Sequence, residues 1–412
     1  MQSIKTNILI LGAGPAGATT ALFLAKKGIP SLLVDKAIFP RDKICGDALS
    51  GKVVEIFNKL DPQLMTDFSR EPTQIGSWGV TFVAPNRKEL RVPFKKNFNK
   101  EKRAPGFISK RIDFDNFLID EVRKHSEVEV MEGVELSKFE KSDDGYTAKS
   151  ASGKFEIETK LVIACDGAHS SFAKEFGGIK MEPAHNCAGL RAYYSGVSGL
   201  DRDNFIELHF LKDFLPGYFW IFPLPNGMAN VGVGMRSDKV SEKKLNLKKR
   251  LQELITTDEM LKHRFQNAEL QGKVMGFGLP LGSKKRPLSG EHFMLCGDAG
   301  SLIDPFTGEG IGNALVSGMF AAQMAESAVS QNEFSANLLK EYDKLVYERL
   351  WSELNLSRKM QQLVNYPWLF NLVVNKANSN KTLSETISCM FEDLDLRAKL
   401  KQPSFYFKLL VG

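Results

Sequence analysis

The chain has 412 residues, of which 43% are apolar and 25% charged, and this ordinary globular composition excludes a largely disordered protein. The length exceeds that of one typical core, so we expect two subdomains and a tail. The formal net charge of +6 is modest, and Lys and Arg gather at 94–103, 243–250 and 284–286. These groups suit solvated faces or a phosphate-rich surface such as anionic lipid, so peripheral membrane contact stays open. We expect no nucleic-acid partner.

The cysteines and histidines indicate a reducing compartment and no metal site. The five cysteines are odd in number and form no Cys-x-x-Cys pair, which argues against a disulfide framework and against zinc. The six histidines form no ligand cluster in the sequence. We therefore expect a cytoplasmic protein without a bound metal, and its oligomeric state stays open.

The N-terminal segment predicts a βαβ unit, with a strand over 7–11, a helix over about 15–27 and a strand over 31–35. Residues 6–25 are uncharged and long enough to resemble a signal or membrane segment. A Gly-Ala-Gly-Pro-Ala-Gly turn lies at their centre, however, and ordinary globular sequence follows directly. We therefore interpret this segment as part of a globular domain.

The turn of this unit has Gly-x-Gly-x-x-Gly spacing, with Gly12, Gly14 and Gly17 directly after the strand. Glycines at these positions permit a tight turn and let the backbone approach a pyrophosphate at the helix N-terminus. Asp35 ends the second strand about twenty residues further on, where an acid bonds the ribose hydroxyls in such sites. The pattern predicts a dinucleotide site without choosing between NAD and FAD.

Later segments alternate between helical and strand-like patterns. They are, in chain order, a helix over 113–125, strands over 127–133 and 160–167, strand-like runs over 186–235, a strand-turn-helix return at 292–300, mostly helix over 309–360, and a helical tail from Pro367. The runs over 186–235 predict a second, sheet-rich subdomain. The segment 75–93 has the same character and is expected to join it.

Two acids that follow later strands resemble a known pair of motifs. CDGAHS, with Asp166, and CGDAG, with Asp298, are similar to the DG and GD motifs of the flavoprotein family that includes hydroxylases of the p-hydroxybenzoate hydroxylase type. In that family the GD aspartate accepts a hydrogen bond from the ribityl chain, and the following helix faces the flavin. The positive end of such a helix also favours negative charge on reduced flavin. The resemblance therefore implies FAD.

Within that family, residues 5–325 resemble the geranylgeranyl reductases and digeranylgeranylglycerophospholipid reductases. PRDKICGDALS (40–50) is similar to the family's P-x-x-K-x-C-G-G-G motif, YFWIFP (218–223) to Y-x-W-x-F-P, and residues 304–322 to a run containing P-x-T-G-E-G-I. Together, the motifs and the resemblance imply cofactor-binding residues at Gly12, Gly14, Ala16, Gly17, Asp35, Lys36, Cys45, Gly46, Ala48, Arg111, Val134, Asp166, Asp298, Gly310 and Ile311.

Some positions depart from the family pattern. Asp47 and Ala48 stand where the family usually has glycines, Asp35 replaces a longer Glu, and Ala173 replaces the usual Arg of the DG motif. We expect cofactor binding to survive these changes, which bear on the identity of the substrate.

Two further groups are candidates for substrate chemistry. Tyr218, Trp220 and Phe222 alternate, so they share one face of a strand and suit an apolar substrate channel, with ordinary core packing as the alternative. The resemblance places Cys45 beside the flavin ring, as a catalytic residue that shapes the alkene pocket or donates a proton. The alternative is a small hydrophobic filler. We interpret His169, near Asp166, as a loop residue.

These observations predict an α/β fold, in which an FAD-binding Rossmann-like domain is interleaved with a mostly antiparallel β-sheet substrate domain and followed by a C-terminal helical segment. The expected FAD-binding domain comprises 1–74, 105–180 and 285–330. The expected substrate domain comprises 75–104 and 181–284, and the helical region 331–412.

The resemblance implies an FAD-dependent oxidoreductase that reduces carbon-carbon double bonds of an isoprenoid or other apolar chain, with NAD(P)H or another donor as transient reductant. A flavin monooxygenase or halogenase-like enzyme is one alternative, although Ser301 occupies the hydroxylases' histidine position and no W-x-W-x-I-P string occurs. A non-catalytic prenyl-binding protein is another, against which the intact dinucleotide motif and Asp298 count. The sequence leaves the particular alkene and the electron donor open.

Overall fold

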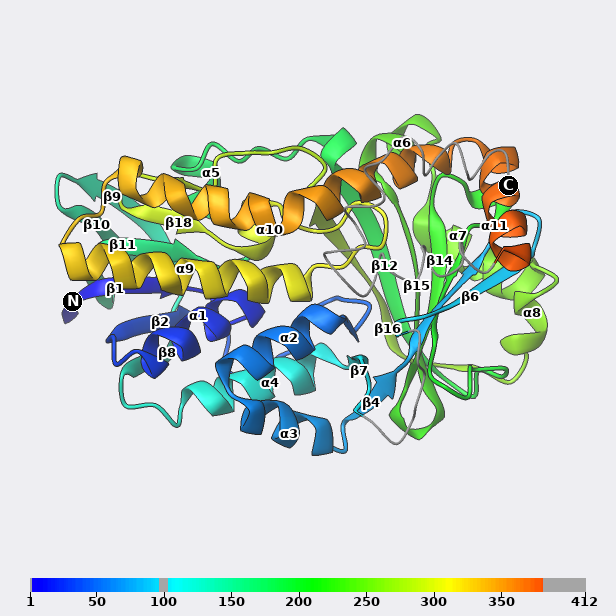
Figure 1. The fold of residues 1–412 in the computed structure, drawn as a ribbon, viewed down its shortest axis with the longest axis horizontal. Helices are drawn as coiled ribbons and strands as arrows, with labels where there is room; N and C mark the ends of the chain where they lie inside the picture. The colour runs from blue at the N-terminus through cyan, green and yellow to red at the C-terminus, as the bar shows by residue number, and fades with distance from the viewer. Residues whose placement is uncertain (1, 96–102, 381–412) are drawn as a thin grey trace.

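The computed structural model describes residues 2–95 and 103–380, which form three β-sheets with helices packed around them (Figure 1). An eight-stranded sheet occupies one end of the elongated molecule and a seven-stranded sheet the other. A small sheet of β3 (Ala48–Leu49), β7 (Gly106–Ser109) and β4 (Gln74–Ser77) lies between them. The arrangement confirms the α/β fold with an interleaved antiparallel sheet that the sequence predicted.

The eight-stranded sheet has the order β17-β18-β11-β1-β2-β8, with β10 and β9 added beside β11. Its strands are β1 (Gln2–Leu11), β2 (Ser31–Asp35), β8 (Val128–Glu132), β9 (Leu136–Ser142), β10 (Gly145–Ser150), β11 (Phe155–Ala164), β17 (Ser289–Gly290) and β18 (Phe293–Leu295). The strands from β18 to β8 run parallel. Residues 8–11 of β1 are buried without interruption, as expected for a parallel strand covered on both faces.

Helices pack around this sheet and the small sheet, and they bring together the glycine-rich turn at 12–17 and a second glycine-rich turn at 296–310. They are α1 (Pro15–Lys26), α2 (Gly51–Leu60), α3 (Pro62–Arg70), α4 (Arg111–Val122), α5 (Ser171–Glu175), α9 (Ile311–Gln331) and α10 (Ala336–Leu363). The Thr20 hydroxyl of α1 donates to the carbonyl of Gly318 on α9 at 3.2 Å. A side chain at Gly318 would lie 2.5 Å from the carbonyl oxygen of Ala16, so only glycine permits this close approach. The N-terminal turn of α1 therefore packs directly against α9.

The seven-stranded sheet has the order β16-β12-β15-β14-β13-β5-β6 and is antiparallel except between β13 and β5. Its strands are β5 (Gly79–Val83), β6 (Glu89–Pro93), β12 (Asn186–Ser195), β13 (Ile206–His209), β14 (Tyr218–Leu224), β15 (Met228–Arg236) and β16 (Glu269–Pro280). Strands β5 and β6 join this sheet, as the sequence predicted for most of the segment 75–93. Residues 75–77 differ from that prediction, because they pair with β7 in β4 of the small sheet. The helices α6 (Ser237–Glu242), α7 (Leu247–Thr257) and α8 (Leu261–Arg264) follow β15 in the chain.

The two faces of the seven-stranded sheet have different surroundings. Leu251 and Leu254 of α7 pack in one cluster with Ile221 and Val231 of the sheet. On β14 the alternate residues Trp220 and Phe222 belong to another cluster, together with the apolar residues of α11 (Pro367–Ser379). One face is therefore closed by helix α7, and the other faces the site described below.

No helix within 2–95 and 103–380 combines the length and hydropathy needed to cross a bilayer. Helix α11 confirms the predicted helix from Pro367, whereas the rest of the predicted tail, beyond residue 380, lies outside the described residues. The domain boundaries proposed from the sequence stay a prediction.

Candidate active site

One cavity of about 1900 Å³ lies where the two large sheets meet and collects nearly all of the predicted site residues. Those that line it are Gly12, Gly14, Ala16, Asp35, Lys36, Cys45, Gly46, Ala48, Arg111, Val134, Asp166, Asp298, Gly310, Ile311, Tyr218, Trp220 and Phe222. Gly17 does not line it, because it packs inside the turn instead. His169 also lies at the cavity, in a loop as predicted, and it is exposed.

The first glycine-rich turn is built by backbone contacts. The N–H of Ala13 donates to Asp35 Oδ2 at 2.7 Å, which ties the turn to the end of β2. Gly12 has φ +89°, and a Cβ there would lie 2.7 Å from the carbonyl oxygen of Cys165. Gly14 precedes Pro15, the first residue of α1, and offers no capping side chain. The free N–H groups of this helix end therefore remain available to an anion.

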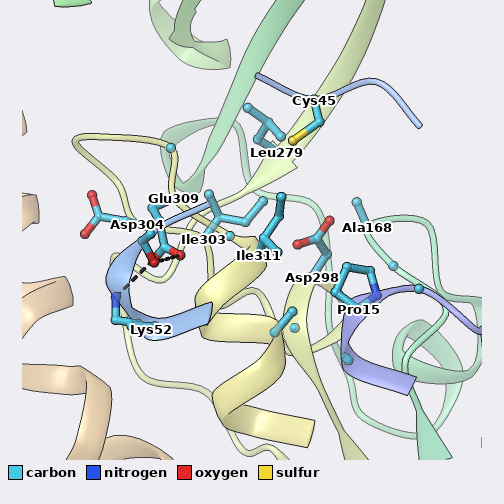
Figure 2. A pocket seen from close by; sticks show the side chains of 18 of the residues that line it. Pro15, Cys45, Lys52, Ala168, Leu279, Asp298, Ile303, Asp304, Glu309 and Ile311 are labelled. Carbon is cyan, nitrogen blue, oxygen red and sulfur yellow. Dashed lines mark hydrogen bonds and ion pairs between the residues drawn. The ribbon is translucent and has the colours of Figure 1, made fainter. Parts of the chain in front are cut away.

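The second glycine-rich turn is held by ion pairs with Lys43 of the Cys45 loop and Lys52 of α2. Figure 2 shows the pair of Lys52 and Glu309. Asp298 Oδ2 lies 3.0 Å from Lys43 Nζ. Glu309 accepts from the N–H of Gly312 at 2.7 Å and pairs with Lys52 Nζ at 2.9 Å. Lys52 in turn pairs with Glu353 of α10 at 2.7 Å. Helix α9 begins at Ile311 after the uncapped Gly310, so a second helix N-terminus opens onto the cavity.

The loop that carries Cys45 lies between these turns and the substrate-facing strands. The Cys45 thiol is half-buried, and burial raises its pKa. Its backbone carbonyl accepts from Asn230 Nδ2 of β15 at 2.8 Å. At Gly46 a side chain would lie 2.9 Å from Phe222 Cε2, so the loop packs closely on β14.

Strand β14 supplies an apolar wall to the cavity. Tyr218, Trp220 and Phe222 all line it, which agrees with their predicted common face. Trp220 Nε1 donates to Asn230 Oδ1 at 2.9 Å, so its indole is fixed while its ring remains part of the wall. The aliphatic and aromatic residues that line the same region are Val80, Phe82, Ile206, Leu208, Leu279, Ile303 and Phe306. A largely apolar ligand suits these surroundings.

Several residues with a structural role in the site were missed from the sequence. Lys43 and Lys52 pair with acids of the second turn, and Asp47 and Asn230 join the Cys45 loop to the strands. Lys43 is the lysine of the quoted P-x-x-K string, so the motif itself could have indicated it. Asn230 lies in an ordinary strand pattern that carries no such signal.

The residues present fit FAD. Two helix N-termini whose N-cap residues are glycines without a capping side chain, at α1 and α9, open onto one cavity that extends to the apolar wall of β14. The first turn of α1 provides backbone N–H donors, and the start of α9 does so except at Gly312, whose N–H donates to Glu309 at 2.7 Å. Asp298 provides a carboxylate at the second turn. The strand-turn-helix unit with its acid at Asp35 and the second turn together define the class of FAD-dependent oxidoreductases.

Comparisons with known proteins agree. Residues 5–191 match the FAD binding domain family, and residues 190–273 match the geranylgeranyl reductase catalytic domain. A digeranylgeranylglycerophospholipid reductase of Thermoplasma volcanium is 31% identical over 349 residues, covering 83% of each chain. The one of Methanococcus vannielii is 27% identical over 423 residues, covering 98% of each chain. This chain belongs to the digeranylgeranylglycerophospholipid reductase family, which confirms the resemblance found in its sequence.

Solved structures share the fold. A geranylgeranyl bacteriochlorophyll reductase-like protein from Thermoplasma acidophilum has a TM-score of 0.78 and 24% identity, covering 97% of this chain and 96% of its own. The flavin-dependent brominase Bmp2 has a TM-score of 0.77 and 21% identity, covering 98% of this chain and 99% of its own. Because reductase-like and brominase structures fit about equally well, the fold alone does not choose the chemistry.

Proposed function

We propose that this FAD-dependent oxidoreductase reduces carbon-carbon double bonds in the isoprenoid chains of a membrane lipid. The observation that carries the proposal is the continuity of one cavity from the two glycine-rich turns to the apolar wall of β14. When bound, reduced FAD supplies the hydride that such a reduction requires. The names of the related reductases support an isoprenoid lipid as the substrate class.

In this proposal the protein places the alkene and provides the proton. Tyr218, Trp220 and Phe222 form the wall against which the isoprenoid chain lies. The Cys45 thiol donates a proton to one alkene carbon while the other carbon receives the hydride, so that two hydrogens are added across the double bond. The resulting thiolate regains its proton from water. A thiol whose pKa is raised by burial is protonated at neutral pH, as a proton donor must be.

Anaerobic half-reactions test the function. The holoenzyme is reduced with NADPH, NADH or ferredoxin, and the reduced protein is mixed with unsaturated isoprenoid lipid or with its fully saturated counterpart. We expect reoxidation of the flavin by the unsaturated lipid and none by the saturated one. Equal rates with both lipids, or fast reoxidation by oxygen that requires an aromatic compound, would contradict the proposal, and the second result would favour a monooxygenase.

Variants of Cys45 test its proposed role. Cys45→Ser keeps the size and weakens the acidity, and Cys45→Ala removes the donor. Both should retain FAD and slow reoxidation by the alkene more than reduction by the donor. If both match the parent protein in single-turnover reoxidation, the proton comes from another source.

The proposal also includes the electron donor and contact with a membrane surface. The sequence contains one full Gly-x-Gly-x-x-Gly motif, which supports a nicotinamide donor that docks transiently.

In the basic group 243–250, Lys243, Lys244, Lys248 and Lys249 are exposed, whereas most of the group 94–103 lies outside the described residues. Each exposed lysine near an anionic bilayer adds about 1 kcal/mol of attraction. The fraction of protein that sediments with anionic liposomes should therefore fall at high salt. An equal fraction at low and high salt would contradict peripheral binding by charge.

A further inference from the structure

Asp47 is a buried acid in a backbone conformation that favours glycine. Its φ is +70°, in the left-handed region, and its side chain has no exposed surface. The family motif that residues 40–50 resemble has glycine at this position, and glycine adopts such a φ without strain. A non-glycine residue held there together with a buried carboxylate indicates a function for the side chain.

The carboxylate of Asp47 joins the Cys45 loop to three other elements. Its Oδ2 accepts from the Tyr193 hydroxyl of β12 at 2.8 Å and from Asn230 Nδ2 of β15 at 2.8 Å. Its Oδ1 accepts from the N–H of Arg111, at the start of α4, at 3.3 Å. The same Asn230 amide donates to the Cys45 carbonyl at 2.8 Å. The position of Cys45 therefore depends on the contacts of Asp47.

The charges around Asp47 leave one cation without a carboxylate of its own. Arg111 donates to both oxygens of Asp115, at 2.7 and 2.6 Å, and Arg41 pairs with the same carboxylate. Two guanidinium groups thus share one acid. Lys43 and Arg191, which also lie beside the loop, have carboxylates of their own, since Lys43 pairs with Asp298 and Arg191 with Asp42. Asp47 supplies the negative charge that offsets the surplus.

We propose that Asp47 is a positioning residue that holds Cys45 in place as a neutral thiol, by tying down its loop and offsetting the charge of Arg111. This inference rests on the proposed role of Cys45 in the reduction. Without the carboxylate, only the Asp115 charge that Arg111 shares with Arg41 would offset the guanidinium, so Arg111 would favour the thiolate, which cannot donate a proton.

The titratable groups of the region agree with this role. Burial raises the pKa of Cys45 most, Arg111 lowers it, and Asp47 raises it. Burial also raises the pKa of Asp47 itself to about 6, so the carboxylate is ionised above that pH. The charged or titratable groups that face the pair are Lys43 from the loop, Arg111 from α4, Arg191 and Tyr193 from β12, and Tyr218 from β14.

Alkylation of Cys45 by iodoacetamide in the FAD-bound protein tests the inference. The rate is followed on the tryptic peptide 44–52 by mass spectrometry between pH 7 and 10, which separates Cys45 from the other cysteines. Asp47→Asn keeps the shape of the side chain and an oxygen for Tyr193 and Asn230, but removes the charge. We expect its rate at pH 8 to rise about tenfold, as a fall of the thiol pKa by about one unit implies. Asp47→Gly should show the same gain.

Three results would overturn the inference. The first is an Asp47→Asn rate within twofold of the parent protein. The second is a gain confined to Asp47→Gly, which would indicate a loosened loop and no effect of charge. The third is an equal gain in Tyr193→Phe, which removes one hydrogen bond to Asp47 and leaves its charge. Asp143→Asn, on the exposed turn between β9 and β10, controls for a general loss of negative charge.

The alkylation rate of Cys45 is measured without lipid, so its outcome is independent of the proposed reduction. If Asp47→Asn shifts the alkylation rate but no unsaturated lipid reoxidises the flavin, the thiol environment is as inferred and the proposed function is wrong. If the lipid reoxidises the flavin and the alkylation rate does not shift, the function stands and the inference about Asp47 is wrong.

Discussion

The two glycine-rich turns both join a parallel strand to a helix, but different contacts hold them in place. In the first turn the space is closed by backbone, since side chains at Gly12 and Gly17 would lie 2.7 and 1.9 Å from carbonyl oxygens. In the second turn, ionic side chains connect Asp298 to Lys43 and Glu309 to Lys52. The first turn therefore depends on the absence of side chains where it meets backbone carbonyls, that of Cys165 just after β11 among them, and the second depends on charged partners from other segments.

The Cys45 loop connects the two turns. A side chain at Gly14 would lie 3.5 Å from the Arg41 guanidinium, so this end of the loop lies beside the first turn. Lys43, two residues further on, pairs with Asp298 of the second turn. Changes in the loop should therefore affect both turns, whereas changes inside one turn should first affect that turn.

The largest effect is expected for Gly17→Ala in the first turn. The new Cβ would lie 1.9 Å from the Gly12 carbonyl oxygen, which is backbone and cannot move aside. We expect a loss of about 3 kcal/mol or more of unfolding free energy, together with loss of FAD, measured by urea unfolding and by flavin absorbance. Gly28→Ala is the matched control, because its φ is +67° and nothing lies within 4 Å. It should cost about 1 kcal/mol. Similar losses of unfolding free energy in Gly17→Ala and Gly28→Ala would contradict the view that close backbone contact holds the first turn.

A change in pH should affect the loop through Asp47. Its pKa is raised from 3.8 to about 6 by burial, so folding favours the protonated form. The resulting stability is complete below pH 3.8 and is lost as the pH rises through about 6. Between pH 4 and 7 the parent protein should lose up to about 3 kcal/mol relative to Asp47→Asn, measured by urea unfolding at each pH. Asp143→Asn should follow the parent protein. A constant difference between Asp47→Asn and the parent would mean that Asp47 does not titrate in this range.

Removal of Lys52 should loosen the second turn. Lys52→Met leaves Glu309 and Glu353, each partly buried, without the cation that lies between them. We expect a loss of about 2 kcal/mol in unfolding free energy and weaker FAD binding. Lys59→Met is the control, because its pair with Glu55 is exposed and should contribute less than about 0.5 kcal/mol. If Lys52→Met matches this control, the second turn does not need its ionic partners.

The smallest effect is expected for Asp298→Ala. Loss of a charged acceptor at the cavity should raise the Kd for FAD about tenfold, or about 1.4 kcal/mol, measured by titration of the apoprotein. Lys43→Met removes the partner and keeps the acceptor, so it should weaken FAD binding less. An Asp298→Ala variant that binds FAD like the parent would show that the second turn does not hold the cofactor.

Much of this site could be predicted because its signals are local in sequence. The strand, the three glycines and Asp35 lie within one βαβ unit, and the spacing alone implies the turn that the structure contains. The alternation of Tyr218, Trp220 and Phe222 likewise places them on one face of a strand, since side chains alternate across a pleated sheet.

The contacts of Asp47 could not be predicted in the same way. Its partners Tyr193 and Asn230 lie 146 and 183 residues away, on strands of the other large sheet. From the sequence, Asp47 was a departure from a glycine pattern without an assigned role. Its burial and its charge balance with Arg111 arise only when the two sheets meet.

The sequence by itself determined the family, the dinucleotide turn, the second acid after a strand and the apolar face of β14, because each depends on residue spacing along one segment. The tertiary structure decided which cations meet Asp298 and Glu309, how Cys45 is held, and why an acid is tolerated at Asp47. These features depend on groups brought together from distant segments, where low exposure makes unpaired charge costly and so selects the partners that each charge requires.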